Sequence, residues 1–260
     1  MLKGIIVGYI TREKKPLKQF LTRRAIIIGG PLLADDISDE ALSTLLSSVK
    51  MLPFFQEGGG GRLTPIYIET RNFHDYSRWK SVFEANGFAY QPHLNFHVDT
   101  TSVEIVEQKL GKNRKRDIKT SLRDGATIVE NPTIEQVRSY YELLKQLYTT
   151  KIKTPLFSLH FFEQLYLHPN GRFILVEKDG EIIGGTVCVE LPNKCLYEWF
   201  VCGRDGEWKS IFPSSLATYA GIRYAAEHRC SRFDMMGAGK PEETYGVRDF
   251  KARFGGATHS

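Results

Sequence analysis

The 260-residue sequence has few cysteines, and no two of them form a CxxC pair. The four are Cys188, Cys195, Cys202 and Cys230. The missing pairs, and the lack of histidines at metal-ligand spacing beside these cysteines, argue against a zinc site. We therefore expect no metal and no cofactor, and we expect buried free thiols in a reducing cytosol.

Long hydrophobic runs are also absent. No apolar run reaches the roughly 18–20 residues of a membrane span, and residues 1–10 lack the cleavage site of a signal peptide. Both absences predict a soluble cytoplasmic protein.

Charge is nearly balanced, because 35 Lys and Arg stand against 30 Asp and Glu. So mild an excess is not a nucleic-acid signature by itself.

The first half of the chain predicts alternating strands and helices. Runs rich in β-branched residues and bounded by Gly or Pro indicate strands. Ser38 is a suitable cap for a helix with a stripe of leucines. The predicted order is strands 4–10 and 24–33, helix 38–52, a flexible loop 56–62, strand 65–70, helix 77–86, and one or two strands within 88–99.

The second half predicts two helices, three strands, a helix, a strand and a last helix. Thr133 and Gln136 form a capping box, and Asp179-Gly180 is a hairpin turn. The predicted elements are helices 134–148 and 158–167, hairpin 172–191, strand 195–203, helix 213–228 and strand 232–237.

A basic segment, residues 109–123, lies between the halves and is predicted to be a helix that links them. It carries seven Lys or Arg residues and one acid. Two interpretations stay open: a solvated helix face, or a ridge that attracts phosphate groups.

The two halves share a short motif. Trp79-Lys80 and Phe83 precede Gly87, and Phe250-Lys251 and Phe254 precede Gly255. Both motifs follow a predicted strand and a polar loop, which favours an internal duplication. We predict a first domain at residues 1–108, truncated at its N-terminus, and a second at residues 109–260.

The element order of the second half resembles the acetyltransferase (GNAT) fold. In that fold two strands splay apart, and a glycine-rich loop at a helix N-terminus holds the donor's pyrophosphate. Here residues 203–215 occupy that place, and bulky Glu207 and Trp208 follow Gly206. We therefore expect that the chain does not hold coenzyme A in the ordinary way.

Residues 214–237, followed by 245–256, resemble the second domain of the Fem family, which comprises bacterial aminoacyl transferases that build peptidoglycan cross-bridges. The family pattern Gly-x-x-x-Phe-Lys-x-x-Phe-Gly is matched in order by Gly246, Phe250, Lys251, Phe254 and Gly255. The resemblance covers about residues 4–256. It implies an α/β (α+β) fold of tandem acetyltransferase-like domains, the first one incomplete.

The same resemblance implies the partners. Aminoacyl-tRNA is the expected donor and a peptidoglycan precursor the expected acceptor, with the chain peripheral at the inner membrane face at most. The late start of the first domain puts the acceptor surface in question. The missing coiled-coil arm suggests only a smaller variant.

Lys251 is the expected centre of the chemistry. An ammonium held by flanking aromatics is a preorganised cation for a tetrahedral oxyanion or for the donor's phosphates. The alternative is a surface lysine whose stem covers Phe250 and Phe254. Asp234, at a strand end near the same loop, is a candidate base or an amine-orienting group, or else a turn carboxylate.

Further candidates for binding substrate surround Lys251 in the expected fold. Tyr197, Glu198 and Trp199 lie on the strand that lines the expected cleft, with Glu198 facing opposite to its neighbours. The others are Tyr245 and Arg248, which frame Lys251, and Lys153, which lies in a region that meets the acceptor in the family.

Three functions remain open at this stage. The first is aminoacyl transfer from aminoacyl-tRNA to an amine of a cell-wall precursor. The second is GNAT-type N-acyl transfer from a thioester in polysaccharide or cell-envelope synthesis. The third is a non-catalytic tandem domain that binds a precursor or a partner.

Overall fold

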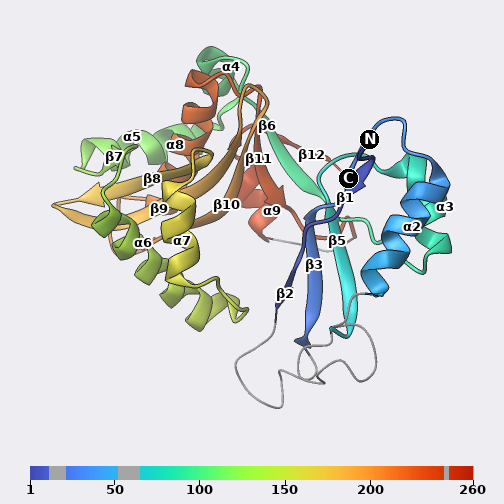
Figure 1. The fold of residues 1–260 in the computed structure, drawn as a ribbon. Helices are drawn as coiled ribbons and strands as arrows, with labels where there is room; N and C mark the ends of the chain where they lie inside the picture. The colour runs from blue at the N-terminus through green and yellow to red at the C-terminus, as the bar shows by residue number, and fades with distance from the viewer. Residues whose placement is uncertain (12–21, 52–64, 243–245, 260) are drawn as a thin grey trace. The chain divides into compact units, whose positions relative to one another are not determined.

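The computed structural model describes residues 1–11, 22–51, 65–242 and 246–259. Contacts divide the chain into two compact units, Met1–Gln91 and Pro92–Ser260 (Figure 1). The predicted loop 56–62 lies outside the described residues. In the part of the chain that is described, no helix is long and apolar enough to cross a membrane.

The first unit contains a three-stranded sheet of order β2-β3-β5 and a two-stranded pair, β1 with β4. Strand β2 is antiparallel to β3, and β5 is parallel to β3. The side chain of Ser38 accepts a hydrogen bond from the Ala41 amide, which confirms the predicted cap. The elements are β1 (Gly4–Ile5), β2 (Tyr9–Thr11), β3 (Arg24–Gly29), β4 (Leu32–Leu33), α2 (Asp39–Lys50), β5 (Tyr67–Asn72), η1 (Ser77–Trp79) and α3 (Lys80–Ala85).

The second unit is built on a seven-stranded sheet of order β12-β6-β11-β10-β9-β8-β7. Its middle contains an antiparallel pair, β9 with β10, and a parallel pair, β10 with β11. The strands are β6 (Asn95–Asp99), β7 (Thr127–Val129), β8 (Gly171–Lys178), β9 (Glu181–Leu191), β10 (Cys195–Gly203), β11 (Arg232–Gly237) and β12 (Ala257–His259). The helices are α4 (Val103–Lys109), α5 (Lys112–Arg123), α6 (Ile134–Leu147), η2 (Tyr148–Ile152), α7 (Leu159–Leu167), α8 (Pro213–Glu227) and α9 (Gly246–Ala252).

Helices cover both faces of this sheet (Figure 1). One core contains residues of α4, α5 and α8, and the other contains residues of α6 and α7. Helix α8 approaches the sheet closely at Gly221, where an added Cβ would lie 3.0 Å from the Phe233 ring. Gly221 thus lets α8 lie close to the sheet.

The two units repeat one succession of elements. An antiparallel strand pair is followed by a helix, a parallel strand and a short helix: β2, β3, α2, β5, α3 in one unit and β9, β10, α8, β11, α9 in the other. The shared motif does not have one environment, however. Lys80 is the exposed first residue of α3, whereas Lys251 is buried near the end of α9.

The unit boundary differs from the predicted one. Contacts divide the chain at Gln91 and Pro92, ahead of the predicted step from residue 108 to 109. The reason is that β6 pairs with both β11 and β12, and Val106 of α4 lies in the core of the second unit.

Local differences from the predicted elements have simple causes. The predicted strand 24–33 is split because Gly29 and Gly30 have positive φ. Only Asn95–Asp99 of the region 88–99 is a strand, since no ladder pairs residues 88–94. A π-helical turn, η2, continues α6.

Candidate active site

Strand β11 separates from its neighbours at Asp234. Its parallel pairing with β10 covers Cys195–Tyr197 against Arg232–Asp234 and ends there. Its pairing with β6 also shifts register between Asp234 and Gly237. Within this irregular stretch Met236 has φ +59°, a left-handed conformation that is strained for a side chain of this size. The end of β11 therefore has backbone carbonyls that the sheet does not use.

Lys251 of α9 binds these carbonyls. Its side chain is buried, with 8% of the residue exposed. Its Nζ donates to the carbonyl oxygens of Met235, of Met236 at 3.2 Å and of Gly237 at 2.8 Å. Three donors thus meet three acceptors. The alternative of a surface lysine is contradicted by this burial.

Burial lowers the pKa of Lys251, while nearby Glu198 and Asp234 act in the opposite direction. These three side chains, which are separated in sequence, are therefore brought together at the point where β10 and β11 diverge. With all three N–H groups engaged, a direct contact between Lys251 and an oxyanion requires that one carbonyl be released. That contact stays a prediction.

Arg248 of α9 has a related role three residues earlier. Its guanidinium donates to the carbonyl oxygen of Ala238 at 3.1 Å and to that of Lys240 at 2.6 Å. Arg248 and Lys251 therefore hold the backbone that follows β11. Tyr245, its predicted companion, lies outside the described residues.

Glu198 is a buried carboxyl on β10. The hydroxyls of Thr186 and Thr218 donate to its Oε1 at 3.2 and 3.0 Å. Burial raises the pKa of Glu198 to about 7, against the opposing effects of Lys251 and the two hydroxyls. The sequence singled out Glu198 but not the two threonines, because nothing in their spacing connects them to it.

A β-bulge changes the predicted alternation on this strand. Glu198 is paired with Cys188 and Phe200 with Val187, so Trp199 has no partner residue on β9. Such bulges redirect side chains and are frequent beside active sites. Tyr197 is 8% exposed, and burial raises its pKa to about 12.

Asp234 is fully buried and is paired with His97, a residue that the sequence did not single out. His97 on β6 lies directly opposite Asp234, and its Nε2 is 3.1 Å from Oδ2 of the carboxylate. The other oxygen of Asp234 accepts the Met236 amide at 2.8 Å. The ring of His97 stacks on that of His259 at 4.4 Å. The pair of His97 and Asp234 joins residues that are 137 positions apart in the sequence, so only the fold could reveal it.

Lys153 is not part of this cluster. It is exposed at the end of η2, where it has φ +59°. No hydrogen bond or ion pair among the described residues joins it to Glu198, Asp234 or Lys251.

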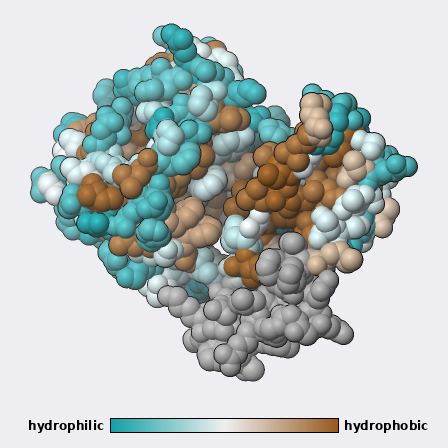
Figure 2. Space-filling view, viewed as in Figure 1, coloured by the Kyte–Doolittle hydropathy of each residue, from teal (hydrophilic) through white to brown (hydrophobic). Residues whose placement is uncertain are grey.

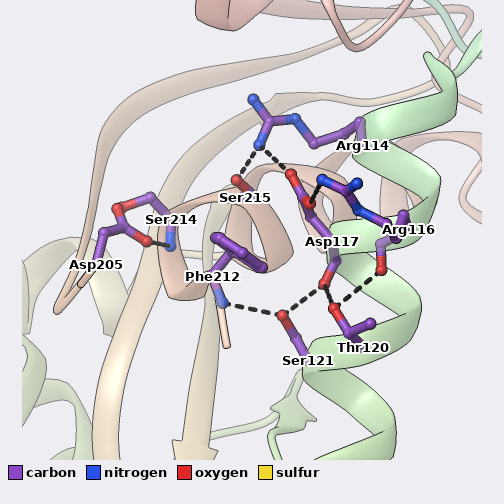
Figure 3. Close-up of polar contacts among 9 residues, drawn as sticks. All are labelled: Arg114, Arg116, Asp117, Thr120, Ser121, Asp205, Phe212, Ser214 and Ser215. Atoms are coloured by element: carbon purple, nitrogen blue, oxygen red, sulfur yellow. Dashed lines mark hydrogen bonds and ion pairs between the residues drawn. The ribbon is translucent and has the colours of Figure 1, made fainter. Parts of the chain in front are cut away.

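The N-terminus of α8 is partly closed, because side chains of the chain itself bind two of its backbone amides (Figure 3). The amide of Ser214 donates to the Asp205 carboxylate at 3.2 Å, and the amide of Phe212 donates to the Ser121 hydroxyl at 2.9 Å. Pro213 has no N–H. A carboxylate therefore occupies the positive end of this helix, where a pyrophosphate would otherwise be favoured.

Arg114 of α5 connects this helix end to α9. Its guanidinium bonds to the Ser215 hydroxyl and lies 3.6 Å from the Asp117 carboxylate. It also lies 4.6 Å from the ring centroid of Phe250 and 4.7 Å from that of Phe254. The two aromatics that flank Lys251 are thus fixed by cation–π contacts with one buried arginine.

The first unit offers no comparable charged cluster in its described part. The polar segment 69–76 forms a local network: Glu69 pairs with Arg24 and Arg71, and Asp75 accepts the Ser77 amide. A shallow hollow of about 410 Å³ lies beside it, lined by residues 2–5, 32–35 and 74–76 and by Trp79, among which Lys3, Asp35 and Asp75 are charged. Figure 2 shows hydrophobic surface gathered on this unit near β1.

In the described residues, no three His, Cys, Asp or Glu side chains are placed to hold a metal ion. The four cysteines are free and buried. Burial raises the pKa of Cys202 to about 12 and that of Cys230 to about 11, so these thiols stay protonated at neutral pH.

Residues 111–251 match a family model described as an acetyltransferase (GNAT) domain. No curated protein matches the sequence. Among solved structures, FemX is 14% identical, with a TM-score of 0.67 over 98% of this chain and 82% of that one. The structure of L-PGS from Bacillus licheniformis is 13% identical, with a TM-score of 0.64 over 98% and 78%.

A third similar structure is the C-terminal domain of a putative lysylphosphatidylglycerol synthetase from Agrobacterium fabrum. It is 13% identical, with a TM-score of 0.63 over 99% of this chain and 79% of that one. At these identities the likeness establishes a shared fold. The predicted resemblance to the Fem family and the tandem acetyltransferase-like α/β fold are thereby confirmed.

Proposed function

The chain belongs to the acetyltransferase (GNAT) domain family, and on that premise we propose that it transfers an aminoacyl group from aminoacyl-tRNA to an amine of a peptidoglycan precursor. The acyltransferase class follows from the family. The donor and the acceptor are the proposed part, and we place the reaction in the cytoplasm, where charged tRNA is found.

The observation that carries the choice of donor is the closed N-terminus of α8. A thioester donor of the coenzyme A type needs free backbone amides and a positive helix end for its pyrophosphate. Here Asp205 takes the Ser214 amide and Ser121 takes the Phe212 amide. The Asp205 carboxylate also repels a second anion. An amino acid esterified to RNA needs no pyrophosphate site at this helix.

The reaction is assigned to the point where β10 and β11 diverge. The acceptor nitrogen attacks the ester carbonyl carbon, an amide bond forms, the ester C–O bond breaks, and the ribose oxygen leaves with a proton. The positive charge of Lys251 stabilises the oxyanion formed on the way, directly if one carbonyl is released or through the backbone that it holds. Glu198 and Asp234 oppose the lowering of the Lys251 pKa by burial.

His97 is proposed as the group that moves the proton. An amine becomes a nucleophile only when it loses its proton, and histidine is the most frequent base for such a step. Asp234 fixes His97 Nε2, which leaves Nδ1 as the nitrogen that accepts a proton. Asp234 is itself too deeply buried to touch a substrate, so it acts as a positioning residue.

A second candidate is N-acyl transfer from a thioester to an amine of a cell-envelope precursor. The match of residues 111–251 to an acetyltransferase domain favours it. The closed N-terminus of α8 weighs against it.

The test is a donor and acceptor screen with product identification by mass spectrometry. The protein is incubated with a pool of charged tRNA or with acyl-CoA, and in each case with muropeptide precursors or phosphatidylglycerol. We expect an aminoacylated muropeptide from charged tRNA only. Acylation from acyl-CoA supports the second candidate, and no product from any pair contradicts an enzymatic role.

A further inference from the structure

The exposed face of α5 carries positive charge only. Lys112, Lys115, Arg116, Lys119 and Arg123 are exposed, whereas Arg114, Asp117, Ile118 and Ser121 are buried. The single acid of the helix, Asp117, is therefore turned inward, where it lies 3.6 Å from Arg114. Among the described residues, only the two arginines of this face have ion pairs, Arg116 with Asp117 at 3.5 Å and Arg123 with Asp124 at 2.6 Å.

Helix geometry places these cations on one line. At about 100° per residue, the five lie within an arc of roughly 100° opposite the buried side. From Lys112 to Arg123 they extend over about 16 Å, at 1.5 Å per residue. We call this set the α5 basic ridge. Of the two interpretations left open by the sequence, it favours the phosphate-attracting ridge, because a merely solvated helix face normally carries charges of both signs.

We infer that the α5 basic ridge binds the phosphate backbone of duplex RNA. This inference rests on the proposed function, in which the acceptor stem of a charged tRNA must lie against the second unit. A nucleic-acid duplex presents about one negative charge per 1.7 Å of its axis, so a row of cations 16 Å long meets several phosphates. Contacts of this type position the RNA without reading its sequence.

A membrane surface fits the ridge less well. Helices that lie on membranes bury a stripe of apolar or aromatic residues beside their cations. The outward arc of α5 has none, and Leu122, the exposed apolar residue of this helix, lies at its edge. The opposite side of α5 is buried against α8 and bonded to Ser215 and Phe212, so it is not free to insert.

The inner side of the same helix reaches the candidate active site. Arg114 contacts Phe250 and Phe254, which flank Lys251. RNA bound on the outer side of α5 is therefore held by the element that also fixes the Lys251 segment. This connection suits a donor whose reactive ester is at the end of an RNA stem.

The test variant is the triple change Lys112→Gln, Lys115→Gln and Lys119→Gln. These lysines have no ion pair among the described residues, so their loss leaves no carboxylate unpaired. The matched control removes three exposed cations elsewhere in the same unit that likewise have no ion pair among the described residues: Lys151→Gln, Lys194→Gln and Arg229→Gln. The two variants have the same net charge as each other, and melting temperatures verify that both fold.

The probes are deacylated tRNA, a blunt RNA duplex of about twelve base pairs, and vesicles with and without phosphatidylglycerol. Each lost phosphate contact reduces the magnitude of the negative slope of log association constant against log salt concentration by roughly 0.7–0.9. We expect the ridge variant to bind both RNAs at least about tenfold more weakly, with a slope whose magnitude is smaller by about 2. The control should bind like the wild type. Equal RNA binding by all three proteins overturns the inference, as does loss of vesicle binding without loss of RNA binding.

Failure of the proposed function gives a different result. If the wild type transfers no amino acid from any charged tRNA but binds RNA through the ridge, the donor assignment is wrong and the ridge stands. If the wild type transfers amino acid and the ridge variant does so with an unchanged KM for charged tRNA, the ridge assignment is wrong and the donor stands.

Discussion

Glu198→Gln is the substitution whose effect on stability can be worked out most fully. The glutamine keeps the Oε1 atom that accepts hydrogen bonds from Thr186 and Thr218. What it removes is a carboxyl whose pKa is raised by burial from its ordinary 4.5 to about 7. The change therefore isolates the cost of charging this side chain inside the folded protein.

The direction of the effect follows from proton binding. Between pH 4.5 and about 7 the unfolded wild type has lost the Glu198 proton while the folded protein still holds it. The folded state then binds more protons, so wild-type stability falls as pH rises through this window. A shift of this size corresponds to about 3 kcal/mol at 1.36 kcal/mol per pKa unit.

Urea unfolding at a series of pH values from 4 to 8 measures this difference. Trp199 and Trp208 report on the second unit by fluorescence. As pH increases from 4.5 to 7, we expect the free energy of unfolding of Glu198→Gln to rise above that of the wild type by up to about 3 kcal/mol. Above pH 7 this difference should stay constant. A difference in unfolding free energy that does not change with pH means that the pKa of Glu198 is not raised in the folded protein.

Three further predictions concern the site. Lys251→Met leaves three carbonyls without their donor, so unfolding free energy should fall by about 1–3 kcal/mol. Turnover should fall by roughly 10²–10³ at a temperature where the variant is folded, and unchanged turnover contradicts the assignment. His97→Gln should lower turnover by about 10²–10⁴ with little change in melting temperature, whereas a rate like that of the wild type excludes His97 as the base. Asp205→Ala should lower stability by about 0.5–2 kcal/mol and make pyrophosphate binding measurable by calorimetry, and no gain in binding means that Asp205 does not close α8.

Periodicity and caps in the sequence were sufficient to predict most elements of the second unit. The capping box at Thr133 and Gln136 is present, and the hairpin, the third strand and α8 begin and end within one residue of their predicted positions. These features depend on neighbouring residues, so a linear pattern contains them. The Fem-like motif likewise identified Lys251, which is buried at the centre of the candidate site.

Other parts of the site could not be predicted because they depend on contacts between distant segments. The pairing of His97 with Asp234 requires β6 to lie beside β11, and the boundary prediction had placed β6 in the other domain. The β-bulge at Trp199 overrode the alternation expected along β10. Arg114, in a basic segment for which the sequence left a solvated face and a phosphate-attracting ridge open, is buried and contacts Phe250 and Phe254.

The proposed donor is an amino acid esterified to tRNA. The most direct test measures transfer of labelled amino acid from a charged tRNA pool to muropeptide precursors, with an excess of either deacylated tRNA or acetyl-CoA as competitor. We expect inhibition by deacylated tRNA, none by acetyl-CoA, and no acetylated product. Inhibition by micromolar acetyl-CoA, or acetylation of the acceptor, would contradict it.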